Sequence, residues 1–427
     1  MKLFQAFKSK LKMTETKKII SVNISWLLIQ NAIKLIFGLT INLYLAKYLG
    51  PESFGIYSYA ISVLIVLLLF TNLGIDPILI RELVDNKINK ASLLGSSFVL
   101  KLFGGIIGFL LMGLLGIYYG FNSETGIVIL LISPILLLRS LSILDSYFQS
   151  KKENKYSAIA NMVSIIFGST LIFLFIKFKY ELEYFALIYV FESAVLSSAL
   201  LFYYLRKCEL HKWIVSKKIS LNILKESWPL IIAGVASIIN YRIDHIYIGS
   251  MLSSSVLGNY SAAAKVSEFW FIIPTILNTV FYPILINLRS LNYNKYKRFL
   301  GLVIISCLCF GIFYSIAITY FSENIILFIF GDKYNLAGEY LSLYIWSTLP
   351  YFTLFILSNV IYLENLIRKN LVISFVSILG NLILNYFFIQ FYGAIGAIYA
   401  TLLVGLISYS LIGYYIFNDT KLLKWYQ

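Results

Sequence analysis

Twelve long apolar stretches divide this sequence of 427 residues, and most of them reach about 20 residues. A helix of about 20 apolar residues crosses the roughly 30 Å hydrocarbon core of a bilayer. Charged residues make up only 13% of the chain, against about 25% in soluble domains. The stretches lie near 19–41, 53–73, 91–118, 125–148, 156–176, 182–205, 228–250, 263–287, 299–321, 340–362, 370–390 and 393–417. The sequence therefore predicts an all-α membrane protein with twelve transmembrane helices.

Basic residues are distributed unevenly between the gaps that separate these stretches. Of the 35 Lys and Arg residues, 26 fall in the two terminal segments and every second gap, 4 fall in the other gaps, and 5 lie inside the apolar stretches. Because Lys and Arg in short loops stay cytosolic, both termini are predicted to face the cytosol. Adding or omitting one helix would move every later loop to the opposite side of the membrane and mix the basic gaps with the others. The clean division therefore also supports a count of twelve helices. The net charge of +15 is then explained by the basic cytosolic loops and by their attraction to anionic lipid, and it does not indicate nucleic-acid binding.

A short internal repeat indicates that the chain consists of two related halves. The segment 54–60 (FGIYSYA) is echoed 203 residues later by 257–263 (LGNYSAA), and each copy follows the first helix of a half. With six helices each, both halves enter the membrane the same way up, as in transporters whose lobes rock around a midplane site. We expect two pseudo-symmetric six-helix bundles. The predicted parts are a cytosolic amphipathic segment 1–18, an N-lobe 19–205, a cytosolic loop 206–227, a C-lobe 228–417 and a cytosolic tail 418–427.

Charged side chains inside the apolar stretches are the strongest functional signal. A charge near the centre of a membrane helix costs about 2.5–3.5 kcal/mol on insertion scales, so such residues usually face water, a partner or a ligand. The basic members, predicted to bind substrate in a cavity, are Lys34, Arg139, Arg242, Lys101 and Lys265. Two structural alternatives remain open: Lys265 could pair with Glu268 three residues on, and Lys101 could extend to the inner surface. Asp244 and Arg242, two residues apart, point to nearly opposite sides of their helix.

Polar residues recur at helical spacing on several of the predicted helices. An internal hydrated cavity would explain these stripes, although Ser, Thr and Asn also bond between membrane helices without any further role. The residues predicted to line the cavity are Gln30, Asn31, Asn161, Asn240, His245, Asn278 and Asn381. An excess of basic groups favours an anionic ligand, and Tyr and Asn suit sugar hydroxyls. Lipid-linked sugar phosphates fit both requirements.

Several short motifs resemble those of a known family. They are 48–57 (YLGPESFGIY), 73–76 (LGID) followed by 81–82 (RE), 242–246 (RIDHI), 258–263 (GNYSAA) and 267–268 (SE). With these motifs the chain resembles the Wzx-type O-antigen and capsule repeat-unit flippases, in the polysaccharide-transporter branch of the multidrug/oligosaccharidyl-lipid/polysaccharide exporter superfamily. The resemblance covers essentially the whole chain in length and helix count.

This resemblance implies a V-shaped pair of lobes in the bacterial cytoplasmic membrane. The implied cargo is undecaprenyl-pyrophosphate-linked oligosaccharide, carried from the inner to the outer leaflet by alternating access through a cationic cavity. Contact with the polysaccharide polymerase machinery is also implied, besides membrane lipid. Family members are thought to use an ion gradient, for which this chain offers Asp244, Glu192 and Asp145. Pro134, Pro274, Pro283 and Pro350 are predicted kink points.

Two other function classes remain open. A multidrug or metabolite exporter of the related branch would share the twelve helices, although export of a cation would favour acidic cavity residues. A membrane-embedded polysaccharide polymerase or glycosyltransferase usually needs a large outer loop, whereas the longest outer gap here is 322–339. The sequence contains no nucleotide-binding loop, metal-ligand spacing or nucleophile motif, so we predict no catalytic residues, no metal and no cofactor.

Overall fold

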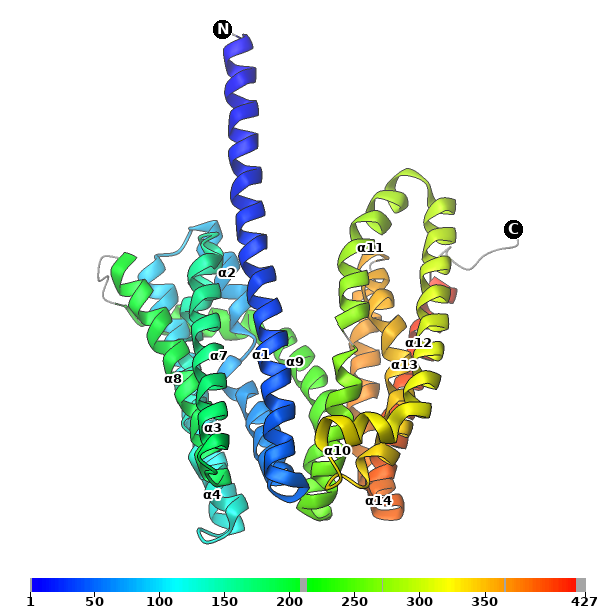
Figure 1. The fold of residues 1–427 in the computed structure, drawn as a ribbon. Helices are drawn as coiled ribbons and strands as arrows, with labels where there is room; N and C mark the ends of the chain where they lie inside the picture. Colours follow the sequence, from blue (N-terminus) through cyan, green and yellow to red (C-terminus); the bar gives the residue numbers. More distant parts are fainter. Residues whose placement is uncertain (1, 208–212, 271, 365, 420–427) are drawn as a thin grey trace. The chain divides into compact units, whose positions relative to one another are not determined.

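The structure is a computed structural model that describes residues 2–207, 213–270, 272–364 and 366–419. Within these ranges every regular element is a helix (Figure 1). Each of the twelve predicted apolar stretches is helical over nearly all of its described length, and eight helical segments are long and apolar enough to cross a membrane. The prediction of an all-α, multi-pass membrane protein is therefore confirmed.

The chain forms two compact units, which are described separately. The first comprises Met1–Leu45 and Val63–Gly234, and the second comprises Ala46–Ser62 and Val235–Gln427. These units differ from the predicted lobes because residues 46–62 pack with the second half of the chain. The lobe boundaries at 205 and 228 stay a prediction. The predicted segment 1–18 continues the first membrane helix from Lys2 on, and its side chains lie outside the described residues, as does the tail from residue 420.

The helices of the first unit follow the chain in order. They are α1 (Lys2–Asn72, apart from 46–62), α2 (Ile75–Asp85), α3 (Lys90–Tyr119), α4 (Glu124–Ile132), α5 (Ile135–Leu138), the 3₁₀ helix η1 (Arg139–Ser142), α6 (Ile143–Ser150), α7 (Asn154–Lys177), α8 (Leu182–Lys207) and the first part of α9 (Lys217–Met251). The second unit contains the rest of α9 and α10 (Ser254–Phe269), α11 (Ile272–Leu291), α12 (Tyr293–Phe330), α13 (Ala337–Leu363) and α14 (Ile367–Asp419).

Glycines divide the two longest helices within or directly beside predicted gaps. In α1 the backbone of Gly50 has φ 74°, and in α14 that of Gly393 has φ 61°. Residues with a Cβ avoid this left-handed region, so glycine is the residue that can turn the chain there. Pro51 follows Gly50 and begins the next helical segment, where a missing N–H costs nothing. Each long helix thus supplies two of the twelve predicted membrane passes.

Proline interrupts the fourth predicted helix. α4 ends at Ile132, α5 begins after Pro134, and a 3₁₀ turn over Arg139–Ser142 separates α5 from α6. Proline lacks an N–H and its ring clashes with the preceding turn, which kinks or breaks a helix. The predicted break at Pro134 is confirmed, and Arg139 consequently lies in a 3₁₀ turn rather than in a regular α-helix.

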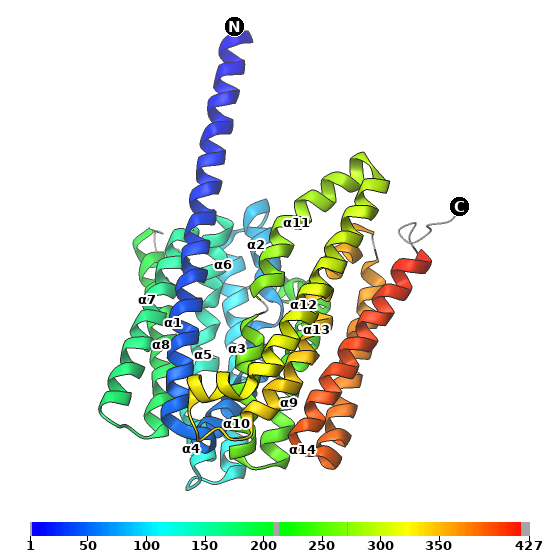
Figure 2. The same ribbon diagram turned by 45° about the vertical axis from the view of Figure 1, so that its right-hand side comes forward.

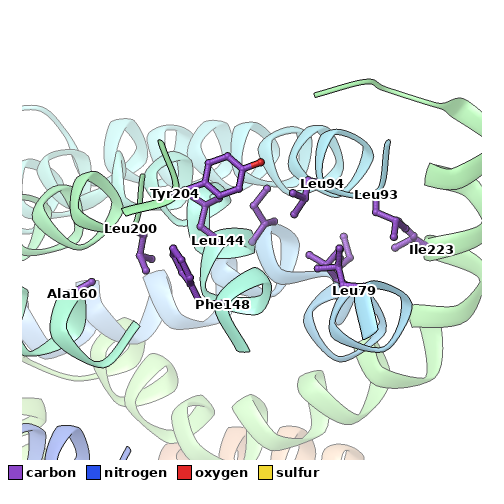
Figure 3. Packing of buried hydrophobic residues seen from close by; sticks show 12 residues of the cluster. Leu79, Leu93, Leu94, Leu144, Phe148, Ala160, Leu200, Tyr204 and Ile223 are labelled. Carbon is purple, nitrogen blue, oxygen red and sulfur yellow. The ribbon is translucent and has the colours of Figure 1, made fainter. Parts of the chain in front are cut away.

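Each unit has its own apolar core. In the first unit, side chains of α2, α3, α6, α7, α8 and α9 meet, and Phe148 and Leu144 lie near the middle of this cluster (Figure 3). In the second unit, α11, α12, α13 and α14 enclose a core that includes Tyr296 and Val360. Close packing inside the membrane depends on small residues. A Cβ added to Gly104 of α3 would collide with the carbonyl oxygen of Phe70, so glycine is required for this approach.

The two copies of the internal repeat contact each other within the second unit. A Cβ added to Gly55 would collide with the carbonyl oxygen of Ser254, and one added to Gly258 would collide with that of Pro51. The two contacts are equivalent, because each partner is shifted by the repeat offset of 203 residues. The pseudo-symmetry predicted from the sequence is therefore visible as a reciprocal contact between backbones.

Candidate functional site

A polar seam joins α1 to α7 in the first unit. Asn23 Nδ2 donates a hydrogen bond of 2.6 Å to the carbonyl oxygen of Lys152. The backbone N–H of Asn154 donates to Asn23 Oδ1 at 3.1 Å. One turn further along α1, Trp26 lies under Lys155, with 5.6 Å between the ammonium and the ring centroid. These contacts orient the polar face of α1 that the sequence predicts toward the start of α7.

Further along this seam, Lys34, Arg139 and Glu192 form a charged cluster. The Glu192 carboxylate of α8 interacts electrostatically with both basic groups. It packs against α7 at Gly168, where an added Cβ would lie 2.9 Å from Glu192 Oε2. Across the described part of the chain, neither Lys34 nor Arg139 has an ion pair within 4.0 Å. One carboxylate therefore faces two basic groups, and the cluster carries a net positive charge.

Arg139 is the least satisfied member of this cluster. Its Nε is buried and has no hydrogen-bond partner among the described residues, and the same holds for Gln30 Oε1. A buried polar atom without a partner costs about 1–3 kcal/mol, and more when the group is charged. For the Arg139 N–H, an anion or water can supply the missing acceptor, whereas Gln30 Oε1 is itself an acceptor and lacks a donor. The arrangement is therefore suited to binding an anion.

Lys101 occupies a different environment from the one that the sequence predicts. Its side chain is fully buried, and Nζ donates to Asp76 Oδ1 at 2.7 Å and to Ser142 Oγ at 2.8 Å. Ser146 Oγ donates to the same Asp76 oxygen at 2.7 Å. The charge of Lys101 is thus neutralised by α2. Sequence reasoning missed Asp76, because it placed this residue in a cytosolic loop, although a carboxylate in a conspicuous LGID motif was a signal.

In the second unit, Asp244 belongs to a closed network. It accepts hydrogen bonds from the backbone N–H of His245 at 2.7 Å and from the hydroxyl of Tyr260, and it lies 2.9 Å from His245 Nδ1. The ring centroids of His245 and Tyr260 are 5.3 Å apart. Both Asp244 and His245 are almost fully buried. This arrangement agrees with the prediction that Asp244 does not neutralise Arg242, and it gives His245 a carboxylate partner.

Arg242, Lys265 and Glu268 form the second charged cluster. Lys265 is repelled by Arg242 and attracted by Glu268. Its ammonium also lies 5.6 Å from the centroid of the Phe54 ring. Among the described residues, no ion pair within 4.0 Å involves Arg242 or joins Lys265 to Glu268. The second unit thus also presents two basic groups to one carboxylate.

The remaining predicted lining residues are more dispersed. Asn240 Oδ1 accepts from Ser377 Oγ at 2.9 Å and from Asn381 Nδ2 at 2.6 Å, so these residues bond between α9 and α14. This is the structural alternative that the sequence analysis left open. Asn161 donates to the carbonyl oxygen of Ser157 in its own helix, and Asn31 is exposed.

Two further predicted site residues differ in how well they are placed. Asp145 accepts from Gln149 Nε2 at 3.2 Å, and its Oδ1 is buried without a partner among the described residues. The side chain of Asn278 lies outside the described residues. The structure therefore gathers Lys34, Arg139 and Glu192 in one unit and Arg242 and Lys265 in the other, and it leaves Asp145 apart from both clusters.

Two family models match the chain. The model described as polysaccharide biosynthesis protein matches residues 20–289. The MatE model matches residues 229–387. No curated protein sequence matches the chain significantly.

Several solved structures share the fold. The lipid II flippase MurJ, in an inward closed conformation, has a TM-score of 0.73 and 19% identity, covering 91% of this chain and 87% of that one. An inward-facing multidrug resistance MATE family transporter of the MOP superfamily has a TM-score of 0.68 and 14% identity, covering 91% and 95%. A MOP superfamily transporter from Pyrococcus furiosus has a TM-score of 0.57 and 13% identity, covering 94% and 96%. The fold is that of the MOP superfamily.

Proposed function

The chain belongs to the polysaccharide biosynthesis protein family, and from this premise we propose that it is a flippase for undecaprenyl-pyrophosphate-linked oligosaccharide. The cargo would be an O-antigen or capsular repeat unit that passes from the inner to the outer leaflet of a bacterial cytoplasmic membrane. A lipid II flippase has the same fold, which supports transport of a lipid-linked headgroup. The distribution of Lys and Arg supports cytosolic termini. Contact with a polymerase stays a prediction.

The observation that carries this proposal is the presence of intramembrane basic groups without ion pairs. Arg139 keeps a buried Nε unpartnered, and among the described residues Arg242 has no carboxylate within 4.0 Å. At about 2.5–3.5 kcal/mol per charge on insertion scales, such groups need a compensating role. Pyrophosphate oxygens accept bidentate hydrogen bonds from guanidinium, which fits this need. We therefore assign phosphate contacts to the basic groups of each charged cluster, Arg139 and Lys34 in the first unit and Arg242 and Lys265 in the second.

The other charged residues enter this proposal in different ways. Lys101 is left out of the binding set because Asp76 already neutralises it. Asp244 is engaged by His245 and Tyr260. Glu192 lies between two basic groups, where release of the anionic cargo would change its electrostatic environment. We therefore take Glu192 as the first candidate for coupling to an ion gradient, ahead of Asp244 and Asp145.

Transport in proteoliposomes tests the assignment directly. Purified protein would be reconstituted with fluorescently labelled undecaprenyl-pyrophosphate oligosaccharide, and a membrane-impermeant quencher would report the leaflet that each molecule occupies. Arg139→Ala and Arg242→Ala should each lower the initial rate at least tenfold, because each removes a charge-assisted phosphate contact of roughly 1.5–3 kcal/mol. Arg139→Lys should retain part of the rate.

Arg206→Ala is the matched control for these two variants. Arg206 is exposed at the end of α8, where it lies over the ring of Phe202 at 4.4 Å. Its replacement removes an arginine without touching either charged cluster, so the rate should stay close to that of the unchanged protein. Full transport by both Arg139→Ala and Arg242→Ala would remove these residues from the proposal.

The MatE match favours one alternative function. Because this model covers residues 229–387, export of a soluble drug or metabolite is the second candidate. The same proteoliposomes distinguish the two functions. Accumulation of a cationic dye, with no movement of the lipid-linked oligosaccharide, would support the exporter and contradict the flippase.

A further inference from the structure

The turn between α12 and α13 lies in the gap 322–339, which follows the ninth predicted apolar stretch. α12 has 38 residues, which corresponds to about 57 Å of helix, whereas the hydrocarbon core measures roughly 30 Å. Its apolar stretch is predicted to end at residue 321, so the last turns of the helix lie in the following gap. Figure 2 shows α12 and α13 side by side. The distribution of Lys and Arg places this turn on the extracytoplasmic side.

Hydrogen bonds hold this turn in place. The hydroxyl of Tyr334 donates to the carbonyl oxygen of Ala46 at 2.6 Å, and burial raises the pKa of Tyr334, so this donor keeps its proton. The backbone N–H of Leu336 donates to Asn259 Oδ1 at 3.2 Å. Gly331 ends α12 with φ 82°, a conformation that favours glycine. The walls around the turn are therefore preorganised.

Two neighbouring cavities open along this turn. They measure about 420 and 470 Å³, and Glu323 and Asn324 line both of them. These volumes fall in the usual range of roughly 300–1,000 Å³ for small-ligand sites. The stem of Glu323 packs on Gly338, where an added Cβ would lie 3.1 Å from Glu323 Cγ. Together the two cavities form a groove, which we name the outer groove.

The outer groove has a mixed lining: Thr319, Tyr334 and Ser342 are hydrogen-bonded. Among the described residues, neither Glu323 nor Glu339 takes part in an ion pair within 4.0 Å. Ser322 is only 4% exposed and lines the groove, yet its hydroxyl has no hydrogen-bond partner in the described ranges. The residue lines the groove, so a ligand or water there can complete the bonding of its hydroxyl. Tyr320, near the end of the predicted apolar stretch, lines the groove with 81% of its surface exposed, at the level where tyrosines contact both the membrane interface and water.

The charge of the outer groove is opposite to that of the intramembrane clusters. Its lining includes the carboxylates of Glu323, Asp332 and Glu339, and no basic residue lines either cavity. An acidic lining repels phosphate and other anions and accepts hydrogen bonds from hydroxyl and ammonium groups. Over the described residues, no group of three His, Cys, Asp or Glu side chains is placed to hold a metal ion. The chemistry therefore favours an organic ligand rich in hydroxyl donors.

We propose that the outer groove binds the sugar portion of a glycan, with a preference for uncharged or amino-bearing sugars over uronic acids. Glu323 and Glu339 accept hydrogen bonds from sugar hydroxyl or ammonium groups, and Ser322 and Asn324 add further polar contacts. Tyr320 stacks on a sugar ring. This assignment rests on the proposed function, because the glycan would reach the groove after the headgroup arrives on the outer side.

Binding of three trisaccharides to the full-length protein in lipid nanodiscs tests this proposal. The probes are chitotriose with free amines, its uncharged N-acetylated form and anionic trigalacturonate, and saturation-transfer NMR gives the affinities. We expect the amine form to bind most tightly and trigalacturonate most weakly. Glu323→Gln should weaken the amine form about tenfold, the loss of one charge-assisted contact of about 1.4 kcal/mol. Tyr320→Ala should weaken the two chito-oligosaccharides by similar factors.

Glu181→Gln is the matched control, because Glu181 is an exposed acid in another gap on the same predicted side. It should leave all three affinities unchanged. The proposal is overturned if none of the three sugars binds, if trigalacturonate binds best, or if Glu323→Gln and Tyr320→Ala bind like the unchanged protein. Binding of calcium at the groove without binding of any sugar would instead identify a cation site, and would also overturn the proposal.

This outcome is separable from that of the proposed function. If sugar binding depends on Glu323 but the protein moves no lipid-linked oligosaccharide, the proposed flippase function is contradicted and the proposed sugar site is retained. If transport depends on Arg139 but no sugar binds at the groove, only the proposed sugar site is contradicted.

Discussion

The buried pair of Lys101 and Asp76 yields the sharpest prediction from this structure. The ammonium is fully buried, whereas the Asp76 side chain is 38% exposed. The two single replacements should therefore have unequal effects. Asp76→Ala leaves a buried charge with only Ser142 as a partner, which costs about 3–5 kcal/mol of unfolding free energy. Lys101→Met leaves a carboxylate that water and Ser146 can still satisfy, so it should cost only about 1–2 kcal/mol.

The double variant separates the pair interaction from local packing. Once Lys101→Met has removed the ammonium, Asp76→Ala should add little further loss, giving a coupling of about 3–4 kcal/mol. Thermal unfolding in detergent, followed by intrinsic fluorescence, measures these differences. For a chain of this size we expect about 1–2 °C of Tm per kcal/mol, so Asp76→Ala should lower Tm by about 5 °C. Additive losses in the double variant would refute the pairing.

Transport by the same variants distinguishes a structural lysine from a substrate-binding one. With rates normalised to folded protein, Lys101→Met should retain most of the transport, because its charge is already neutralised by Asp76. Arg139→Ala should not. If Lys101→Met were as stable as the unchanged protein and yet inactive, Lys101 would bind substrate as the sequence predicts, and its exclusion here would be wrong.

Two further predictions concern the packing and the predicted cytosolic face of the second unit. Gly55→Ala and Gly258→Ala should each lower the unfolding free energy by about 1–3 kcal/mol, because the added Cβ meets a backbone carbonyl. Gly301 and Gly413 serve as controls, because no atoms lie within 4 Å of a Cβ added there. Their replacement by Ala should stabilise their helices by up to about 1 kcal/mol. Equal effects on Tm in all four variants would contradict the close contact of the repeats. Glu364→Gln should cost about 1 kcal/mol, because Arg289 Nε donates to Glu364 Oε1 at 2.9 Å. This bond raises the pKa of Arg289, so the contribution is fully present below the ordinary Arg pKa and is lost only as the pH rises through the raised value. Melting curves at several pH values in the neutral range should show the same loss, and a loss that varied across that range would contradict this reasoning.

Helix faces inferred from spacing were informative but incomplete. Spacing predicted that Asp244 and Arg242 point to different sides, which agrees with the pairing of Asp244 to His245 and Tyr260. Spacing also suggested pairing of Lys265 with Glu268, yet no ion pair within 4.0 Å joins them in the described part of the chain. A helical register shows which residues share a side, but side-chain rotamers and neighbouring helices decide whether they meet.

The outer groove could not be predicted from the sequence. Its acidic residues lie in the gap 322–339, for which the sequence predicts only an outer loop, and Tyr320 lies at the end of the apolar stretch before it. The two cavities arise because the end of α12 packs against the start of α13 and Glu323 lies between them. Exposed Asp, Asn and Tyr residues are ordinary in a loop, so their residue types alone carried no signal of a site.

The sequence by itself determined the class of the protein, its membrane passes and the positions where its longest helices divide. These features depend on local properties: the length of apolar runs matches the bilayer, loop charge sets orientation, and Gly and Pro permit or prevent particular backbone angles. Tertiary structure alone decided which buried charges are neutralised. Lys101 pairs with Asp76, 25 residues away on another helix, whereas Arg139 retains an unpartnered Nε among the described residues. Identical charges in equally apolar helices differ in this way because each partner comes from whichever helix packs beside it.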